Sequence, residues 1–478
     1  MLKATPRLIG ITLMILSTLA IAKPDCKKTF VEKSEQALAC YLAEPENIDK
    51  PWVLNSKRYD DTRKVSIETY NLISQHWPKA DMSSHGILWK HSLILYQPDI
   101  VKTNQALLFV NGGTRYPNSH GDNPPPHPLD FARIAAETNS IVIDLHDIPN
   151  QYLFFDDNVP RKEDSIVAYT WNRYMNNPDS GVYWPIHLPM TKAIIKAMDA
   201  AQQITAQNNI RIQYFVVAGA SKRGLATWLA ALSDERINAI IPIVIDILNT
   251  KENLDLIYSS YNNHWPPAFH DYMEEKIPDR INTVEFTRLM QIEDPLAYLT
   301  SGNGSLYKKR LAIPKYIISA SGDDFFAPDS LSLYLDKLPG ENKVRVVPNQ
   351  SHHIDMKIVE NAILSYYQTI TKHTPRPSLT WKTNAAGKLV NVVTNRQASS
   401  VKLWEAENPD MRDFRLAAHI TYSATELKGH CINHHCQYPV TIQSPTKGWK
   451  ASFVEVIFHD AEKEPLVLTT PISITNNE

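Results

Sequence analysis

A serine at position 221 lies where a hydroxyl could act as a nucleophile. Residues 214–218 (YFVVA) form a short apolar run typical of a buried strand, residues 219–224 (GASKRG) interrupt it, and apolar residues at helical spacing continue to position 232. A strand, a sharp turn with serine at its apex and a helix make a nucleophile elbow, which lifts the hydroxyl clear of the sheet. The pattern departs from G-x-S-x-G because Arg223 stands two residues after Ser221 and the glycine is displaced to position 224. An ordinary serine in a strand-to-helix turn is therefore the alternative.

The two partners that a serine nucleophile needs follow it in the chain. A histidine must accept the serine's proton, and a carboxylate must hold that histidine in the right tautomer. Asp323 and Asp324 follow the apolar run 316–319, and His352 follows the apolar run 344–347. The order Ser, acid, His is that of α/β-hydrolases. Each residue alone could cap a helix or lie in a solvated turn, but the joint order favours a serine hydrolase.

The residues themselves leave the choice of acid open. Asp323 lies closer to the end of its strand, whereas Asp324 stands four residues before Pro328, a spacing often seen after the acid in this fold. His352 is preferred to its neighbour His353 because a serine, the kind of small residue usual before the base, precedes it.

Backbone N–H groups near Ser221 are expected to stabilise the oxyanion that forms when a serine attacks a carbonyl. One donor would be the N–H of Lys222, at a helix N-terminus where the dipole is positive. The second would come from Gly113 or its neighbour, in the loop after the buried strand 106–110. Both loops would lie at the carboxyl ends of parallel strands, where such sheets bind ligands.

Strands and helices that alternate along most of the chain predict a mostly parallel sheet. The expected strands are 65–77, 87–96, 106–110, 140–145, 214–218, 238–247, 316–319 and 344–347. An amphipathic helix is expected over 190–204. Together with the elbow, these elements predict an α/β-hydrolase domain over residues 61–373. Aromatic residues, Trp265 among them, gather between about 250 and 310, where we expect a cap over the site.

Residues 1–22 are typical of a secretory signal peptide. Lys3 and Arg7 precede an apolar stretch, and Ala20-Ile21-Ala22 has the form of a cleavage site. An uncleaved anchor is the alternative. The following residues, 23–60, are polar and irregular, so we expect an N-terminal arm there. The mature protein would be secreted or periplasmic.

Four cysteines remain in the mature chain: Cys26, Cys40, Cys431 and Cys436. An even number in an exported protein favours disulfides. Three pairings are possible, and Cys26 with Cys40 and Cys431 with Cys436 is the local one. The histidines between Cys431 and Cys436 raise the alternative of a metal site, but the spacing fits no common zinc pattern well. We therefore expect neither a metal nor a cofactor.

The last hundred residues change character. Short alternating runs occur at 378–381, 389–393, 401–404, 420–422, 440–442, 452–458 and 466–468. This spacing predicts a β-sandwich over residues 374–478, immunoglobulin-like in architecture only, since the cysteine and tryptophan spacing of antibody domains is missing.

Charge and hydropathy narrow the class of partner. The net charge is −2, and basic residues form no block, so nothing favours nucleic acid or an anionic membrane surface. After the signal peptide, no stretch is long and apolar enough to cross a membrane. A small-molecule or peptide substrate is the expected partner, and the oligomeric state stays open.

Several motifs give the chain a resemblance to the PhoPQ-activated pathogenicity-related protein family, whose eukaryotic relatives include secreted autocrine proliferation repressors. The motifs are Ile148 to Gln151, Arg161 to Asp164, Tyr169 to Trp171, Leu188 to Ala193, Ala197 to Asp199, Gly219 to Gly224, Asp246 with Leu248-Asn249, Pro314 to Tyr316, Gly322 to Phe326, Pro328 to Ser330, and Pro348-Asn349 with His352. The resemblance implies an exported α/β-hydrolase-like protein, linked in bacteria to envelope stress and virulence, with a poorly defined substrate. It makes the displaced Gly224 the family's own elbow form.

Two departures from the family pattern bear on the site. Asp324 stands where glutamate is common, which favours Asp323 as the acid. Residues 262–264 (NNH) precede Trp265 where a glycine-containing stretch is usual, so the cap and the specificity could differ.

Five polar residues are candidates for the wall of a substrate pocket: Asp144, Asn150, Gln151, Glu163 and Asp164. The alternative is a structural network that satisfies loop backbone. In a peptidase of this fold, Glu163 or Asp164 could hold a substrate amine. The leading hypothesis is an exported serine hydrolase that cleaves an ester or peptide bond. The competing one is a catalytically silent signalling or binding protein on the same scaffold.

Overall fold

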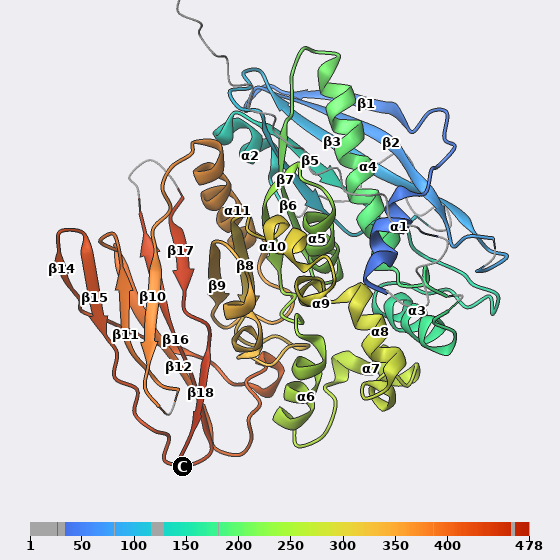
Figure 1. Cartoon of the computed structure of the whole chain (residues 1–478). Helices are drawn as coiled ribbons and strands as arrows, with labels where there is room; N and C mark the ends of the chain where they lie inside the picture. The colour runs from blue at the N-terminus through green and yellow to red at the C-terminus, as the bar shows by residue number, and fades with distance from the viewer. Residues whose placement is uncertain are drawn as a thin grey trace, which may run out of the picture.

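The computed structural model describes residues 26, 34–80, 82–115, 129–179, 181–385, 387–459 and 464–477. The expected signal peptide lies outside these ranges. Within them, nine strands form one central sheet in the order β1-β2-β3-β5-β4-β6-β7-β8-β9 (Figure 1). The strands are β1 Trp52–Asp60, β2 Val65–Trp77, β3 Ile87–Pro98, β4 Gln105–Val110, β5 Ile141–Leu145, β6 Tyr214–Ala220, β7 Ile237–Ile243, β8 Lys315–Ala320 and β9 Asn342–Val347.

The pairing of these strands is that of an α/β-hydrolase. β1, β2, β3 and β5 are antiparallel to their neighbours in turn, and the pairs from β5 through β4 to β9 are all parallel. Every residue of β4 and β5 is buried, because helices cover both faces of the parallel part. The expected fold class is therefore observed.

Helices divide between the two faces of the sheet. The helices are α1 Ala37–Ala43, α2 Phe131–Thr138, α3 Asp164–Asn176, α4 His187–Ala206, α5 Lys222–Ser233, α6 Thr250–Ser260, α7 His270–Glu274, α8 Val284–Glu293, α9 Pro295–Thr300, α10 Gly304–Arg310 and α11 Met356–Thr371. Leu108 of β4 belongs to the apolar cluster of α4 and α5, whereas its neighbour Leu107 belongs to that of α2 and α11. The alternation follows from the two-residue period of a strand.

The N-terminal region is more regular than expected. It contributes α1 and the edge strand β1, which pairs antiparallel with β2. Seven of the nine β1 side chains are exposed, so the strand lacks the apolar alternation that identifies a half-buried strand in a sequence. α1 is fixed to the sheet by the hydroxyl of Tyr41, which donates to Gln75 at 2.7 Å. A disulfide joins Cys40 of α1 to Cys26.

The segment between β7 and β8 carries α6 to α10, and Figure 1 shows α6, α7 and α8 gathered beyond one end of the sheet. β7 ends at Ile243, four residues before the expected end. The chain turns there because Val244 has a φ of 44°, and its N–H donates to Ile318 of β8 at 2.7 Å. Residues 244–247 are buried although they leave the strand, which is why their apolar sequence resembles a strand's.

The C-terminal residues form two antiparallel sheets, as expected for a sandwich. Within the described ranges, one has the order β10-β11-β15-β14 and the other has β13-β12-β16-β17, with β18 also pairing to β16. The strands are β10 Leu379–Thr383, β11 Leu389–Thr394, β12 Ser400–Asn408, β13 Ser423–Glu426, β14 His430–Ile432, β15 His435–Pro439, β16 Trp449–Phe458, β17 Leu466–Thr469 and β18 Ser473–Asn476. Val392 and Val454, one from each sheet, lie in the same apolar cluster.

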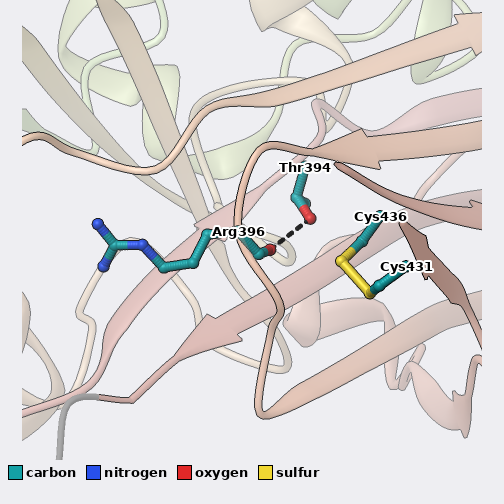
Figure 2. The surroundings of a disulfide bond; sticks show 4 residues. All are labelled: Thr394, Arg396, Cys431 and Cys436. Atoms are coloured by element: carbon teal, nitrogen blue, oxygen red, sulfur yellow. Dashed lines mark hydrogen bonds between the residues drawn. A yellow bond between two sulfur atoms is a disulfide. The ribbon is translucent and has the colours of Figure 1, made fainter. Parts of the chain in front are cut away.

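Two of the expected strands in this region are wrong. Residues 420–422 and 440–442 are irregular, although Tyr422, Val440 and Ile442 are buried. Buried loop residues mimic a short strand because burial, rather than pairing, selects apolar side chains. Cys431 and Cys436 form a disulfide across the β14–β15 hairpin, near Thr394 of β11 (Figure 2).

The sandwich packs against the edge of the central sheet. Figure 1 shows its strands beside β8 and β9. The N–H of Val346 in β9 donates to the hydroxyl of Thr469 in β17 at 2.9 Å, and the hydroxyl of Tyr316 in β8 donates to the carbonyl of Val467 at 2.6 Å. The two parts of the chain therefore share buried hydrogen bonds. Among the described helices, none is both long and apolar enough to cross a membrane.

Candidate active site

Ser221 lies at the apex of a strained turn between β6 and α5. Its φ of 56° and ψ of −132° are unusual for a residue with a side chain. The backbone holds it there, because the N–H of Ser221 donates to the carbonyl of Ile243 in β7 at 2.8 Å. Within the described residues, its hydroxyl makes no hydrogen bond to the protein, and Ser221 lines a cavity.

The displaced glycine of the elbow has a packing reason. A Cβ at Gly224 would lie 2.8 Å from the carbonyl oxygen of Gly219, and a Cβ at Gly219 would lie 2.8 Å from that of Arg223. Both contacts are closer than carbon and oxygen allow, so the turn needs glycine at both positions. The first turn of α5 thus crosses the end of β6 without side chains between them.

Arg223 lies behind the loop that follows β4. Its Nε donates to the carbonyl of Ile148 at 2.6 Å, and a Cβ at Gly112 would lie 2.7 Å from its Nη2. Gly112 and Gly113 come directly after β4, whose Val110 pairs with Gly219 of β6. The Gly-Gly loop and Ser221 therefore leave neighbouring strands at the same edge of the sheet.

Asp323 pairs with His352. Both carboxylate oxygens lie 3.0 Å from Nδ1 of the imidazole, and both side chains are buried. The N–H of Phe325 donates to the same carboxylate at 2.8 Å, which fixes its orientation. No hydrogen bond or ion pair joins Asp324 to His352 in the part of the chain that the structure describes. Asp323 is thus the carboxylate that can hold the imidazole tautomer.

The charge of Asp323 changes the proton affinity of His352. Burial alone would lower the pKa of His352, but the charge and hydrogen bond of Asp323 outweigh burial and raise it above its ordinary value. The rings of Phe325 and Phe326 contact the imidazole, with centroids 4.6 and 5.9 Å away. Both phenylalanines line the same cavity as Ser221, so residues of the cavity wall contact His352.

The residue after the serine anchors a compact ionic cluster. The ammonium of Lys222 is buried and lies 2.8 Å from Glu163 and 3.2 Å from Asp164. Glu163 also accepts from Arg223 at 2.6 Å and from the amide of Gln151 at 2.7 Å. Burial would raise the pKa of Glu163, but the two cations outweigh burial and hold it well below its ordinary range. Two carboxylates and two cations leave the cluster without net charge.

A cavity of about 60 Å³ lies beside Ser221. Its wall is formed by the turn between β6 and α5, the loop after β8 that carries Asp323, helices α3 and α4, and the segment between β7 and β8. Most lining side chains are apolar: Val167, Trp171, Leu225, Ile245, Ile247, Leu254, Trp265, Phe269, Tyr272, Ile277, Pro278, Ile281, Phe325 and Phe326. Asp164, His187, Ser221, Lys222 and Thr250 complete it. The cavity suits an apolar group held close to the Ser221 hydroxyl.

The five polar residues expected at the pocket wall do not all lie there. Asp144 of β5 is buried and pairs with His146 at 2.6 Å. Asp164 lines the cavity, as does Trp265 from the cap. Gln151 and Glu163 lie behind it: the Gln151 amide donates to the carbonyl of Gly113 at 2.9 Å and thereby ties the ionic cluster to the Gly-Gly loop. Asn150 is further away and exchanges hydrogen bonds with the backbone of Lys90 in β3.

The sandwich also contacts both loops of the Asp–His pair. The N–H of Leu416 donates to the carbonyl of Gly322 at 3.0 Å, directly before Asp323. Asn349, three residues before His352, exchanges two hydrogen bonds with the backbone of Tyr422, at 2.7 and 3.0 Å. The segment between β12 and β13 therefore braces the loops that carry Asp323 and His352.

An ion pair adds to this brace. Arg412 pairs with Asp329 in the acid loop and donates to the hydroxyl of Ser260 at the end of α6 at 2.6 Å. No sequence pattern predicted these contacts, because they join distant segments through backbone groups and charged side chains. Two further buried His–carboxylate pairs, His187 with Glu293 and His146 with Asp144, were also missed. Among the described residues, no three His, Cys, Asp or Glu side chains converge to hold a metal.

Comparison with known proteins places the chain in a family. Residues 38–415 match the model of the PhoPQ-activated pathogenicity-related protein. The autocrine proliferation repressor protein A of Dictyostelium discoideum is 31% identical over 469 residues, which cover 91% of this chain and 90% of the relative.

Solved structures share the fold only distantly. An acetyl xylan esterase from Paenibacillus sp. R4 is 14% identical with a TM-score of 0.43, covering 70% of this chain and 92% of its own. A glucuronoyl esterase from Solibacter usitatus is 14% identical with a TM-score of 0.39, covering 71% of this chain and 91% of its own. At this level the likeness bears on neither substrate nor mechanism.

Proposed function

The chain belongs to the PhoPQ-activated pathogenicity-related protein family, and we propose that it is an exported serine hydrolase with Ser221 as nucleophile. The hydrolase scaffold is observed. The proposal rests above all on one arrangement: a serine with strained backbone at the end of β6 faces a cavity whose wall also contacts the buried His352–Asp323 pair.

The proposed roles follow from this geometry. His352 would take the proton of Ser221 as the hydroxyl attacks a carbonyl carbon, and would return it to the leaving group. Asp323 would hold Nδ1 protonated so that Nε2 is the base. The oxyanion would accept hydrogen bonds from the N–H of Lys222, which is unpaired within its helix because it lies in the first turn, and from Gly113. Loss of one such donor typically costs about 3 kcal/mol in the barrier.

The state of the two acidic residues favours an ester over a peptide with a free amino terminus. A substrate amine would need an unpaired carboxylate, whereas Glu163 is shared between Lys222 and Arg223. Asp164 accepts from Lys222 and from the hydroxyl of Tyr272 at 3.1 Å. Displacing these partners would leave buried cations unpaired, which is costly. We therefore propose an uncharged ester with an apolar acyl group as the substrate class.

Matched chromogenic substrates test this proposal. The protein is expected to hydrolyse p-nitrophenyl esters of medium-chain acids and not the p-nitroanilides of amino acids with a free amino group, and Ser221→Ala should abolish the hydrolysis. Faster cleavage of the anilides would contradict the ester assignment. Ester cleavage that survives Ser221→Ala would contradict the assignment of the nucleophile.

Export and a role in envelope stress or virulence belong to the proposal as well. The two disulfides suit an oxidising compartment. The name of the Dictyostelium relative, a repressor of proliferation, favours one competing function, namely a secreted signal that keeps the scaffold without turnover. A folded protein whose Ser221 reacts with no activated ester or phosphonate would support that alternative.

A further inference from the structure

The cavity beside Ser221 holds a polar atom that the protein leaves unused. His187, at the first position of α4, lines the cavity and is 2% exposed. Its Nδ1 lies 2.6 Å from the carboxylate of Glu293 in α8 but without the geometry of a hydrogen bond, and within the described ranges its Nε2 has no hydrogen-bonding partner either. A buried nitrogen without a partner is costly, so this atom calls for an explanation.

The other polar side chains of the cavity are occupied by the protein. Asp164 pairs with Lys222, and the hydroxyl of Tyr272 donates to Asp164. The hydroxyl of Thr250 donates to Asp294 at 3.2 Å. Within the described residues, Nε2 of His187 is a buried nitrogen of a lining side chain that has no protein partner.

The His187–Glu293 pair is built as a fixed unit. The indole N–H of Trp171 donates to the other oxygen of Glu293 at 3.1 Å. This bond and the contact with His187 hold the carboxylate from both sides. The carboxylate lies beside Nδ1 of the imidazole as a close ion-pair partner. His187 is thus paired with a carboxylate, as His352 is with Asp323, but within the described residues it is not placed beside a serine.

Aromatic rings fill the wall around this pair. The ring of Trp171 lies 5.7 Å from that of Tyr272, Tyr272 lies 5.5 Å from Phe269, and Phe269 lies 5.3 Å from Trp265. A continuous wall of rings favours a flat, apolar body. If a flat apolar group filled the cavity, His187 would contact any polar atom that this group carries.

We propose that His187 is a specificity-determining residue that binds a hydroxyl group on the acyl part of the ester substrate. A hydroxyl can both donate and accept, so it satisfies Nε2 whether or not that nitrogen carries a proton. An ammonium or carboxylate would instead bring an unpaired charge into an apolar cavity. The substrate class is thus an ester of a hydroxylated aromatic acid, and this inference rests on the proposed hydrolase function.

Pairs of esters that differ by one hydroxyl test the inference. The probes are the methyl esters of phenylacetic, 3-phenylpropanoic and 4-phenylbutanoic acid, each with and without a para-hydroxyl group. At the chain length that fits, the wild-type protein should prefer the hydroxylated ester in kcat/KM by at least about tenfold, since one buried hydrogen bond is at stake. A ratio near one at every length would overturn the inference.

Variants assign the preference to the imidazole. His187→Phe keeps the ring and removes the nitrogen, so the ratio should fall to near one, whereas His187→Gln should restore part of it. His270→Phe is the matched control, because His270 is an exposed histidine of the cap and its loss should leave the ratio unchanged. A ratio that persists in folded His187→Phe would refute the assignment.

A binding measurement separates this inference from the proposed function. Calorimetry with the Ser221→Ala variant needs no turnover, and it should show tighter binding of the hydroxylated ester by a similar factor. Equal binding of both esters, with labelled Ser221 in the wild-type protein, would refute the role of His187 and leave the hydrolase proposal standing. Preferential binding of the hydroxylated ester without any reaction at Ser221 would support the role of His187 and contradict the hydrolase proposal.

Discussion

The buried carboxyl group of Asp246, near the proposed triad, is expected to destabilise the folded protein when it ionises. Asp246 follows β7, is buried, and accepts a hydrogen bond from the hydroxyl of Tyr334 at 2.7 Å. Burial raises the pKa of Asp246 to about 6, and the charge of Asp323 adds to this, whereas Tyr334 and His352 lower it. In the unfolded chain the carboxyl would have its ordinary pKa of 3.8.

The sign of the effect on stability follows from these two values. A group whose pKa is raised by folding contributes stability below its unfolded pKa and loses it as the pH rises through the folded pKa. The full loss for Asp246 is about 3 kcal/mol, since each unit of pKa difference corresponds to about 1.4 kcal/mol. About 1.4 kcal/mol of this loss falls between pH 5 and pH 8.

Asp246→Asn should remove this dependence. The asparagine keeps an acceptor for the Tyr334 hydroxyl and cannot ionise. Urea unfolding of both proteins at pH 5 and pH 8 gives the difference in the free energy of unfolding at each pH. We expect the variant to gain about 1.4 kcal/mol relative to the wild type on going from pH 5 to pH 8. A difference that is the same at both pH values, or that changes in the opposite direction, would refute the reasoning.

Two further predictions concern the loops that carry the acid and the base. Asp323→Asn should slow the reaction of Ser221 with a fluorophosphonate by orders of magnitude. It should also move the acid limb of the pH–rate profile to lower pH, because the neutral amide no longer raises the pKa of His352. The matched Asp324→Asn variant should change the pH–rate profile little, and equal effects of the two substitutions would contradict the choice of acid. Arg412→Ala should lower the free energy of unfolding by about 2 kcal/mol, because it leaves Asp329 unpaired, and should also slow labelling; unchanged labelling would show that the sandwich does not brace the acid loop.

Much of the fold was predictable because strands buried on both faces of a sheet have continuous apolar sequences. β4, β5, β6 and β8 are short continuous apolar runs, and each was placed within one or two residues. β1 was missed because its side chains face solvent. Residues 244–247 and 440–442 were assigned to strands because burial in a loop leaves the same mark as burial in a sheet.

The site residues likewise divide into those that a local sequence pattern could predict and those that it could not. Ser221, Asp323 and His352 could be named because each stands directly after a buried strand, so topology alone brings them to one edge. The residues alone left Asp323 and Asp324 open and the family resemblance favoured Asp323, but the contact of Asp323 with His352 depends on the orientation of a loop. The contact of His187 with Glu293 joins two helices that no local pattern relates, and the Leu416 brace uses backbone atoms, which leave no trace in residue types.

The reactivity of Ser221 is the most direct test of the whole account. The mature protein is incubated with a fluorophosphonate, and the modified peptide is identified by mass spectrometry, alongside folded Ser221→Ala and His352→Ala variants. We predict a single modification on Ser221 that depends on His352, because only an activated hydroxyl reacts rapidly with this reagent. A folded wild-type protein that stays unmodified, or that reacts equally well without His352, would contradict the proposal of a serine hydrolase.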